Sequence, residues 1–374
     1  MKNLFSWLEN RTTGAVGLGK GLLHESIPGG AKWRYSWVTL LVFTYLLQAI
    51  TGFFIWMFYS PSTQTAWESI YYLQNQVPGG WFLRALHHYT AQVVVVLTAL
   101  HLLQMIVYKA YQAPREINFW LVLLLLPLVM GLSVTGWLLP YDQRGFWASR
   151  VPLNILSIIP MIGPKIARVL IGGKEFGHHT LTHFLALHAG LLPVLTFIVL
   201  FAHYLLYRRH GLSQVPAKTE VKTASYFPDQ LLRDAVVCLA LVAVLLFIIL
   251  RGAMGGAGSP MGVEIGAPAD PTEPYAAARP EWFMLFLFQL LKFFPGGTEI
   301  IGAVIIPTIV MGVIAAMPFI GKWNYGHRFN LLFTGALVIC ATILTGLAFK
   351  QDGADAGFLN AKREARIAGE RTQV

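Results

Sequence analysis

The chain has 374 residues, of which 55% are hydrophobic and 12% are charged, and its mean hydropathy is +0.57. This charged fraction is about half of that in soluble domains, so the composition excludes a soluble globular protein. The formal net charge of +10 does not indicate nucleic-acid binding, because the basic residues lie between apolar runs and form no single stripe; loops that face anionic lipid account for them.

Seven apolar stretches are long enough to cross a bilayer as helices. The sequence therefore predicts an all-α polytopic membrane protein with about seven transmembrane helices. Prolines inside three of them predict local kinks: Pro127, Pro193 and Pro307. In chain order, the stretches lie near 37–59, 88–110, 118–139, 185–207, 232–250, 299–319 and 329–349.

Two connections are longer than turns. The segment 140–184 has the aromatic, Pro and Gly content of short interfacial helices. The segment 251–298 begins Gly-rich and ends in PEWFMLFLFQLLKFF, which is too short to span and is predicted to lie at the membrane surface. We divide the chain into an N-terminal interfacial segment (1–36), a four-helix half (37–210), a linker (211–230), a three-helix half (231–350) and a charged, peripheral or disordered tail (351–374).

The N-terminal segment contains no apolar core of a signal peptide, so the first span is expected to direct insertion. With the tail left out, the distribution of Lys and Arg favours a cytoplasmic N-terminus. Cys238 and Cys340 lie inside apolar runs and belong to no CxxC motif. We therefore expect both to be buried small hydrophobic residues, and we expect no covalent haem c, zinc or iron–sulfur ligation.

Four histidines deep in two apolar stretches form the strongest signal. His87 and His101 are 14 residues apart, and His188 and His203 are 15 apart. At about 100° per residue these spacings return to within about 40° and 60° of one helix face, with rises of about 21 and 22 Å. Two such helices that face each other would form two bis-histidine pairs near opposite leaflets, the arrangement that two haem b groups need. Two nitrogen ligands per iron favour electron transfer over oxygen chemistry.

The alternative is that these are isolated histidines, hydrogen-bonded within the helix bundle. The matched spacing of two histidines on each of two helices disfavours this alternative. Gly52 and Gly136 are expected near the level of His87 and His188, where glycine lets a macrocycle approach the backbone. The alternative is that these glycines serve close packing between helices, which uses the same residue type. The histidines of the 140–184 segment are expected to be solvated rather than to bind a metal: His178, His179 and His183.

Five motifs accompany these histidines: LQAITGFF, GWFLRALHHYTAQ, VTGWLLPYDQRGFWAS, LTHFLALHAGLLPVL and ARPEWFMLFLFQLL. With them, the chain resembles cytochrome b of the cytochrome bc/b6f family from about Trp33 to Phe349. The spacing of 15 residues in the fourth stretch and the motif YRRHGLS are similar to the b6f-like branch, here with both halves fused. The resemblance implies that His87 and His188 bind the haem on the quinol-oxidising, positive side. It implies that His101 and His203 bind the haem near the negative side.

The resemblance also implies further site residues. Arg84 matches an arginine that pairs with a haem propionate; an interfacial anchor at the helix end is the alternative. Glu281 is implied as the proton acceptor, its pKa raised by partial burial, with helix capping as the alternative. The quinol-oxidation pocket is implied to be lined by Pro280, Glu281, Trp282, Phe283, Tyr141, Asp142, Gly145, Phe146 and Trp147.

The chain departs from the family pattern at several positions. Phe283 replaces a tyrosine, Gln104 replaces an arginine near the negative-side haem, and His183 stands where an arginine precedes the fourth span. Val38 and Val122 stand where the family usually has glycine. Ser36 occupies the place of a cysteine that tethers an extra haem, so a covalent third haem is not expected. Candidates for a quinone-reduction site are Arg208, His210 and Asp234, with solvated loop charges as the alternative.

The predicted function is the dihaem cytochrome b subunit of a quinol:cytochrome c (or similar acceptor) oxidoreductase complex that translocates protons, in the bacterial cytoplasmic membrane. Its expected partners are a Rieske-type iron–sulfur protein, a c-type cytochrome subunit, quinone, membrane lipid and a second copy of the complex. Two alternatives remain. A dihaem membrane anchor of another quinone-linked oxidoreductase shares paired histidines but has no reason to carry PEWF. A transporter with a histidine proton relay needs mid-membrane acids, which the seven stretches almost lack.

Overall fold

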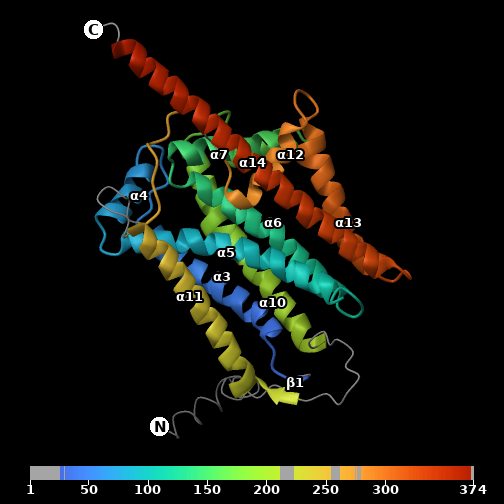
Figure 1. Ribbon diagram of the computed structural model, residues 1–374. Helices are drawn as coiled ribbons and strands as arrows, with labels where there is room; N and C mark the ends of the chain where they lie inside the picture. The colour runs from blue at the N-terminus through green and yellow to red at the C-terminus, as the bar shows by residue number, and fades with distance from the viewer. Residues whose placement is uncertain are drawn as a thin grey trace. The chain divides into compact units, whose positions relative to one another are not determined.

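The computed structural model describes residues 26–28, 30–210, 223–253, 262–273, 275 and 279–371. For residues 26, 28, 208, 223, 252–253 and 352–371 this description covers the backbone alone. The described residues are mainly helical, with two short strands, β1 (Ser26–Pro28) and β2 (Thr223–Ser225), that pair antiparallel with Ile27 opposite Ala224 (Figure 1).

Seven helices of the described residues are long and apolar enough to cross a membrane, which confirms the predicted number of spans. Their ends fall within a few residues of most predicted ends. In three of these spans, a π-helical segment is followed directly by an α-helix. The spans are α3 (Ser36–Trp56), α5 (Gly80–Val107), α6 (Glu116–Leu138), α9–η2–α10 (His178–Leu185, Ala186–Leu191, Leu192–His210), η3–α11 (Tyr226–Gln230, Leu231–Ala253), η5–α13 (Ile301–Ile305, Ile306–Ile320) and α14 (Gly326–Arg371).

The prolines inside the spans disturb them unequally. Proline removes a backbone donor and crowds the preceding turn. The π segment η2 ends two residues before Pro193, and η5 ends two residues before Pro307, so a widened turn takes up the change at both places. At Pro127 the α geometry of α6 continues without a π segment.

Helix α14 differs from the sequence prediction. The last span was expected to end near residue 349, and the span in the structure ends close to this, at Gln351. The helix itself continues to Arg371. The sequence after Lys350 is rich in Ala and Arg, which favour helix even without apolar surface to bury. The expectation of a disordered tail is therefore wrong for the backbone as far as Arg371.

Short helices connect the spans. Helices α7 (Gln143–Ser157) and α8 (Gly163–Ile171) confirm the short helices predicted for 140–184. The apolar run after PEWF forms η4 (Trp282–Met284) and α12 (Leu285–Lys292), which confirms a helix too short to span. Two others are η1 (Trp33–Tyr35) and α4 (Ala66–Asn75).

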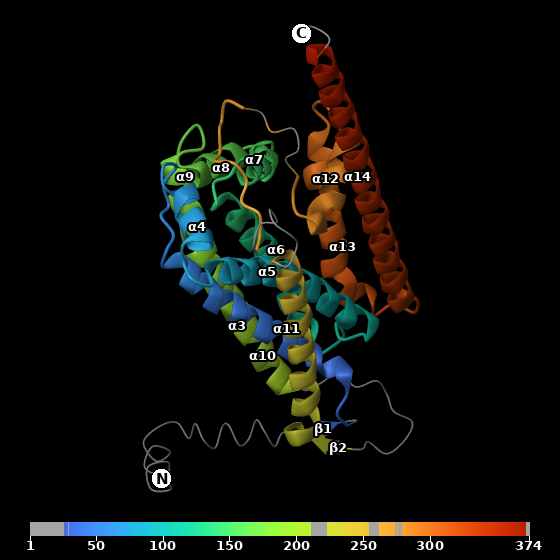
Figure 2. The same cartoon turned by 60° about the vertical axis from the view of Figure 1, so that its left-hand side comes forward.

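Contacts divide the chain into two compact units. In unit 1, α3 packs on α5, and α11 packs on both (Figures 1 and 2). In unit 2, α7 packs on α8, and α14 packs on α12 and α13. Unit 1 comprises Met1–Ser60, Glu68–Ser133 and Ala189–Ile265, and unit 2 comprises Pro61–Trp67, Val134–His188 and Gly266–Val374.

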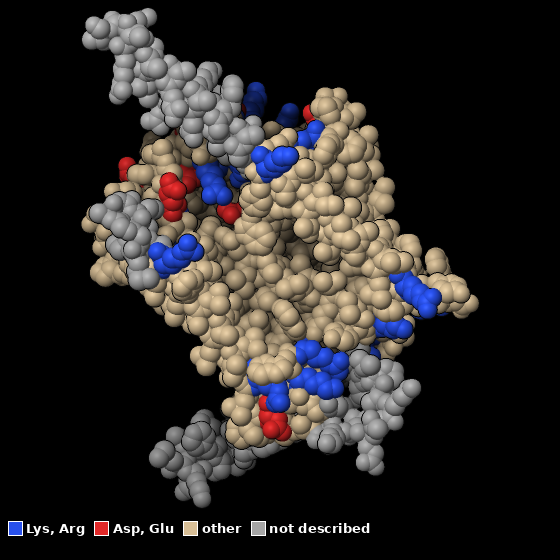
Figure 3. Space-filling model, viewed as in Figure 1, with Lys and Arg blue, Asp and Glu red and all other residues tan. Residues whose placement is uncertain are grey.

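Large apolar side chains cover the outer faces of the spans. Leu239 and Phe247 of α11 are exposed, as are Leu332 and Ile339 of α14, and much of the surface in Figure 3 carries neither Lys and Arg nor Asp and Glu. Such faces suit a lipid solvent, where apolar exposure costs nothing. The expectation that both cysteines are buried is wrong for Cys340, whose side chain is exposed, while Cys238 is half-buried. A lipid-facing position and a core position are both apolar, so the sequence cannot separate them.

Candidate functional site

His101 of α5 and His203 of α10 lie together in unit 1, and we call them the buried histidines. Their rings are 5.6 Å apart between centroids and nearly perpendicular, at 88°. Their exposed fractions are 7% and 8%. His101 Nε2 and His203 Nδ1 are buried without a hydrogen-bond partner. A buried imidazole nitrogen without a partner is costly unless a ligand such as iron takes it.

The surroundings hold each buried histidine differently. His101 Nδ1 is 3.3 Å from Gln104 Oε1, one turn further along α5. The side-chain amide of Gln104 also donates to the carbonyl of Arg34, at 2.8 Å, which anchors the glutamine to η1. His203 Nδ1, by contrast, is buried without a hydrogen-bond partner. Gln104, noted in the sequence only as a departure, therefore orients a candidate ligand.

His87 of α5 lies against α3 in unit 1. A Cβ on Gly52 would come within 3.0 Å of His87 Cε1, so glycine is needed for this close approach. The hydroxyl of the preceding residue, Thr51, donates to the carbonyl of Leu47 at 2.7 Å. It lies 2.9 Å from His87 Nδ1 and can accept that proton. With the proton on Nδ1, the lone pair of Nε2 is available to a metal.

The same arrangement recurs in unit 2 around His188, which lies in the π segment η2. A Cβ on Gly136 of α6 would come within 2.7 Å of His188 Cε1. The hydroxyl of Thr135 is 3.3 Å from His188 Nδ1. We call His87 and His188 the glycine-flanked histidines. Because they belong to different units, their pairing stays a prediction.

Sequence reasoning missed Thr51 and Thr135. The signal that could have found them is the Thr-Gly dipeptide, which occurs in both stretches that carry the expected haem glycines. A threonine next to a glycine on a helix lies on an adjoining face, so its hydroxyl can reach the ring that the glycine admits.

Glu281 begins η4 in unit 2. Its carboxylate accepts a hydrogen bond from Arg144 of α7, with Nη2 3.3 Å from Oε1, and 15% of its side chain is exposed. Burial raises the pKa of Glu281, and the Arg144 charge opposes that rise. The Glu281 side chain makes no capping hydrogen bond to η4, so the alternative of a helix cap lacks support. A half-desolvated carboxylate suits proton transfer.

Tyr141 and Asp142 connect α6 to α7. Asp142 is the N-cap of α7: Oδ1 accepts from Gly145 N–H at 2.7 Å, and Oδ2 accepts from Gly266 N–H at 3.1 Å. Both carboxylate oxygens therefore accept hydrogen bonds from backbone N–H groups. Tyr141 is buried in the left-handed region, at φ 48°, a strained conformation that often occurs at functional sites. Burial raises its pKa, against a smaller effect of the Arg150 charge.

Aromatic side chains surround these groups within unit 2. Phe283 lies 6.4 Å from the ring of Trp137, between centroids. Phe146 is fully buried and packs edge-on against Trp147, at 5.3 Å. Trp282 is exposed, at 45%, and Pro280 is half-buried. Most of the residues expected around a quinol pocket therefore lie on α7 and η4 of one unit.

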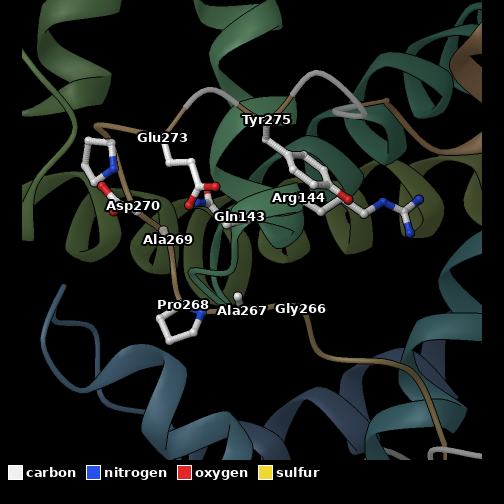
Figure 4. Close-up of a pocket in the computed structure, with 10 residues that line it drawn as sticks. Gln143, Arg144, Gly266, Ala267, Pro268, Ala269, Asp270, Glu273 and Tyr275 are labelled. Atoms are coloured by element: carbon white, nitrogen blue, oxygen red, sulfur yellow. The ribbon is translucent and has the colours of Figure 1, made fainter. Parts of the chain in front are cut away.

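An open cavity of about 620 Å³ lies beside Arg144 (Figure 4). The start of α7 lines one side, and the extended segment after Gly266 lines the other. An antiparallel bridge between Asp142 and Pro268 fixes this segment. The charged and phenolic side chains that line the cavity are Arg144, Asp270, Glu273 and Tyr275.

Arg84, expected beside a haem propionate, binds protein oxygens instead. Its guanidinium donates to the side chain of Gln74, to the carbonyl of Val263 at 2.6 Å and to the carbonyl of Glu264 at 3.3 Å. These bonds tie α5 to α4 and to the segment before Gly266. The propionate pairing stays a prediction.

Asp234, a candidate for quinone reduction, is buried in unit 1. Its Oδ2 accepts from Thr39 at 2.7 Å and from Tyr226 at 3.1 Å, and its Oδ1 accepts from Gln230 at 2.8 Å. Gln230 also donates to Ser36, at 3.1 Å. Protein donors therefore engage both carboxylate oxygens, and the alternative of a solvated loop charge does not hold for Asp234.

The other candidates for quinone reduction lie at the end of α10. The side chain of Arg208 lies outside the described part of the structure. His210 Nδ1 is buried without a hydrogen-bond partner, and the carbonyl of His210 accepts from Arg115 at 3.1 Å. The structure does not test whether a quinone binds here.

The histidines of the 140–184 segment do not gather around a metal position. His183 Nδ1 hydrogen-bonds to the carbonyl of Val169 at 2.8 Å, and its ring is 6.4 Å from that of His179. Among the residues that the structure describes, no three His, Cys, Asp or Glu side chains could hold a metal ion together.

The sequence and the fold are similar to those of known proteins. The sequence matches the family model of cytochrome b/b6/petB over residues 24–211. The menaquinol:cytochrome c reductase cytochrome b subunit of Geobacillus thermodenitrificans is 40% identical over 221 residues, 57% of this chain and 98% of that protein. The cytochrome bc complex cytochrome b subunit of Chlorobaculum thiosulfatiphilum is 31% identical over 332 residues, 86% of this chain and 75% of that protein. The fold is similar to a chain of a hyperthermophilic respiratory Complex III, with a TM-score of 0.72 and 19% identity over 93% of this chain and 99% of that one.

Proposed function

The chain belongs to the cytochrome b/b6 family, and from this premise we propose that it is the dihaem cytochrome b subunit of a quinol-oxidising bc-type complex. The observation that carries the proposal is the pair of buried histidines, with ring centroids 5.6 Å apart and two unpartnered ring nitrogens. The family implies haem b. The number of haems and their ligands are our proposal.

The residues of unit 1 fit one bis-histidine site, and we propose a second site from the glycine-flanked histidines. His101 and His203 would hold one haem b, since both rings are buried and each has a nitrogen free of protein partners. His87 and His188 would hold the other, because each has a glycine that leaves room for a macrocycle. When bound, haem iron takes up and releases single electrons. The protein supplies the ligands, the spacing and the proton routes.

Quinol oxidation is proposed at the end of α6, the start of α7 and η4. A quinol must lose two protons as its electrons leave. Glu281 is the proposed proton acceptor, because its carboxylate is largely shielded from water yet paired with an exposed Arg144. Tyr141, Trp282 and Phe283 are proposed to line the apolar part of the site, while Asp142 holds the α7 start in place.

Quinone reduction is proposed near Asp234, Arg208 and His210. The unpartnered Nδ1 of His210 supports a ligand there, whereas the Asp234 carboxylate already accepts three protein hydrogen bonds. We therefore assign Asp234 to the support of the site rather than to direct contact with quinone. Arg84 would bind a propionate only if it exchanged one of its backbone partners.

The chain is an integral membrane protein. We propose that the complex lies in a bacterial cytoplasmic membrane and passes electrons to a c-type cytochrome through a Rieske-type iron–sulfur protein. The names of the relatives, a menaquinol:cytochrome c reductase subunit and a bc complex subunit, support this assignment. A dimer of the complex is part of the proposal.

Glu281→Gln in the isolated complex tests the quinol-oxidation site. Because an amide cannot accept the quinol proton, quinol:cytochrome c reductase turnover should fall about 100-fold, with haem absorbance unchanged. Glu299→Gln is the matched control, since Glu299 is an exposed carboxylate of the same unit. Undiminished turnover in Glu281→Gln removes Glu281 from the proton path.

A further inference from the structure

Arg144 is the second residue of α7 and stands between Glu281 and the open cavity. Its side chain is 55% exposed, whereas that of Glu281 is 15% exposed. One nitrogen, Nη2, contacts Glu281 Oε1 at 3.3 Å, and the side chain also lines the cavity (Figure 4). A partly buried carboxylate is thus joined to an open, water-accessible groove through one guanidinium.

The other cations near this site are directed elsewhere. Arg279, two residues before Glu281, lies over the ring of Phe288, with Cζ 5.6 Å from the centroid. Lys292 of α12 lies over the same ring, at 5.1 Å. Arg150 of α7 lies over Trp147, at 4.9 Å. The acids of the cavity, Asp270 and Glu273, belong to the extended segment after Gly266 that forms its other wall (Figure 4). Arg144 is therefore the charge to which the Glu281 carboxylate responds.

We propose that Arg144 is a positioning residue, which lines the cavity and holds the Glu281 carboxylate in the form that accepts the proton of a bound quinol. This inference rests on the proposed function of Glu281. It adds a residue that the sequence motif PEWF does not contain.

Each electron that leaves the quinol is matched by one proton. One O–H bond breaks, its proton moves to Glu281, and one electron passes to a one-electron acceptor of the proposed complex. After Glu281 has released this proton to water, it can accept the proton of the second O–H bond as the second electron leaves. Protonation neutralises the carboxyl group and removes its attraction to Arg144. Loss of the proton to water in the cavity restores the ion pair, so Arg144 favours the return of Glu281 to its charged form.

The sign of the pH dependence follows from two opposing effects. Burial raises the pKa of Glu281, and Arg144 lowers it. Quinol oxidation needs the ionised carboxylate, so activity rises with pH through this pKa. Without the Arg144 charge the pKa rises further, and the acidic limb of the activity profile must move to higher pH.

The experiment is the pH profile of quinol:cytochrome c reductase activity in the isolated complex, for wild type, Arg144→Gln, Arg144→Lys and Arg168→Gln. In Arg144→Gln we expect about a fivefold loss of activity on the acidic limb and wild-type activity on the alkaline plateau. The acidic limb of Arg144→Lys should lie between that of wild type and that of Arg144→Gln. Arg168 is an exposed arginine of α8 in the same unit, and its replacement should leave the limb unmoved.

An unmoved acidic limb in Arg144→Gln, with intact haem spectra, overturns the proposal. An equal loss at every pH also overturns it, because that result indicates a structural role. Failure of the proposed function looks different, since wild type would then oxidise no quinol or Glu281→Gln would keep full turnover. Adding Arg144→Gln to Glu281→Gln should change the residual rate no further; an additional pH shift would show that Arg144 acts through another group.

Discussion

His101 and His203 face each other ring to ring in a buried part of unit 1, whereas His87 and His188 lie half-buried, each against a glycine of a neighbouring helix. In the first pair, His101 Nδ1 lies beside Gln104, and His203 Nδ1 is buried without a hydrogen-bond partner. Each member of the second has a threonine hydroxyl near Nδ1, at 2.9 and 3.3 Å. The same residue type therefore has two kinds of support in one chain.

The difference lies in what fixes the imidazole. Among the buried histidines, His101 is held by its contact with Gln104. Valines stand 14 residues before Gly52 and Gly136, at Val38 and Val122. Val122 is fully buried, so side-chain volume there is already filled. The glycine-flanked histidines are fixed by a hydroxyl and lie close to backbone. We infer that a macrocycle at the glycine-flanked positions approaches helix backbone more closely than one at the buried positions.

Removal of a ligand gives the largest effect. His203→Ala should abolish the haem of the buried histidines and leave the other haem, because the two sites share no ligand. His188→Ala should do the reverse. Redox titration of the reduced-minus-oxidised absorbance of each variant separates the two signals. Loss of both signals in either variant, or two unchanged signals, contradicts independent bis-histidine sites.

Adding a methyl group beside a glycine-flanked histidine gives the next effect. Gly136→Ala places Cβ 2.7 Å from His188 Cε1, and Gly52→Ala places it 3.0 Å from His87 Cε1. The imidazole ring must move further in Gly136→Ala than in Gly52→Ala, so Gly136→Ala should lose more haem. We expect haem retention in Gly136→Ala to fall about tenfold. Absorbance of the purified complex during detergent washing measures this loss.

Gly131→Ala is the matched control for both glycine variants. It lies on the same helix α6, and its added Cβ would meet Leu192 at an ordinary contact of 3.5 Å. Alanine in a helix should raise stability there by about 0.5–1 kcal/mol. Haem loss in Gly131→Ala as large as in Gly136→Ala would mean that helix packing, and not the ring, requires the glycines.

The sequence could predict the number of spans and the proximity of His101 and His203, because both rest on strong, regular patterns. Apolar length determines whether a helix can span, and 14- and 15-residue spacings place His87, His101, His188 and His203 on helix faces. It could not predict that Cys340 is exposed, since apolar residues occur on lipid-facing and protein-facing sides alike.

Contacts between distant segments were equally beyond the sequence. The ion pair of Arg144 and Glu281 joins residues separated by 137 positions. Asp142 was expected at the quinol pocket, yet both its carboxylate oxygens accept hydrogen bonds from backbone N–H groups, one in α7 and one at Gly266. A carboxylate in a motif does not reveal whether substrate or backbone amides will occupy it, because both require the same oxygens.

Loss of a threonine hydroxyl gives the smallest effect and tests the comparison most directly. A hydrogen bond from Nδ1–H makes the imidazole a stronger donor to iron and so favours the oxidised state. Thr51→Val should therefore raise the midpoint potential of the glycine-flanked haem by about 40 mV, the one-electron equivalent of about 1 kcal/mol, and leave the other haem unchanged. Thr135→Val should shift it less, because its contact is 3.3 Å rather than 2.9 Å. Thr182→Val, at an exposed threonine of α9, should shift neither potential. Equal shifts of both haems in Thr51→Val would mean that the hydroxyl acts through the whole bundle, and the contrast between the two kinds of histidine would then lose its basis.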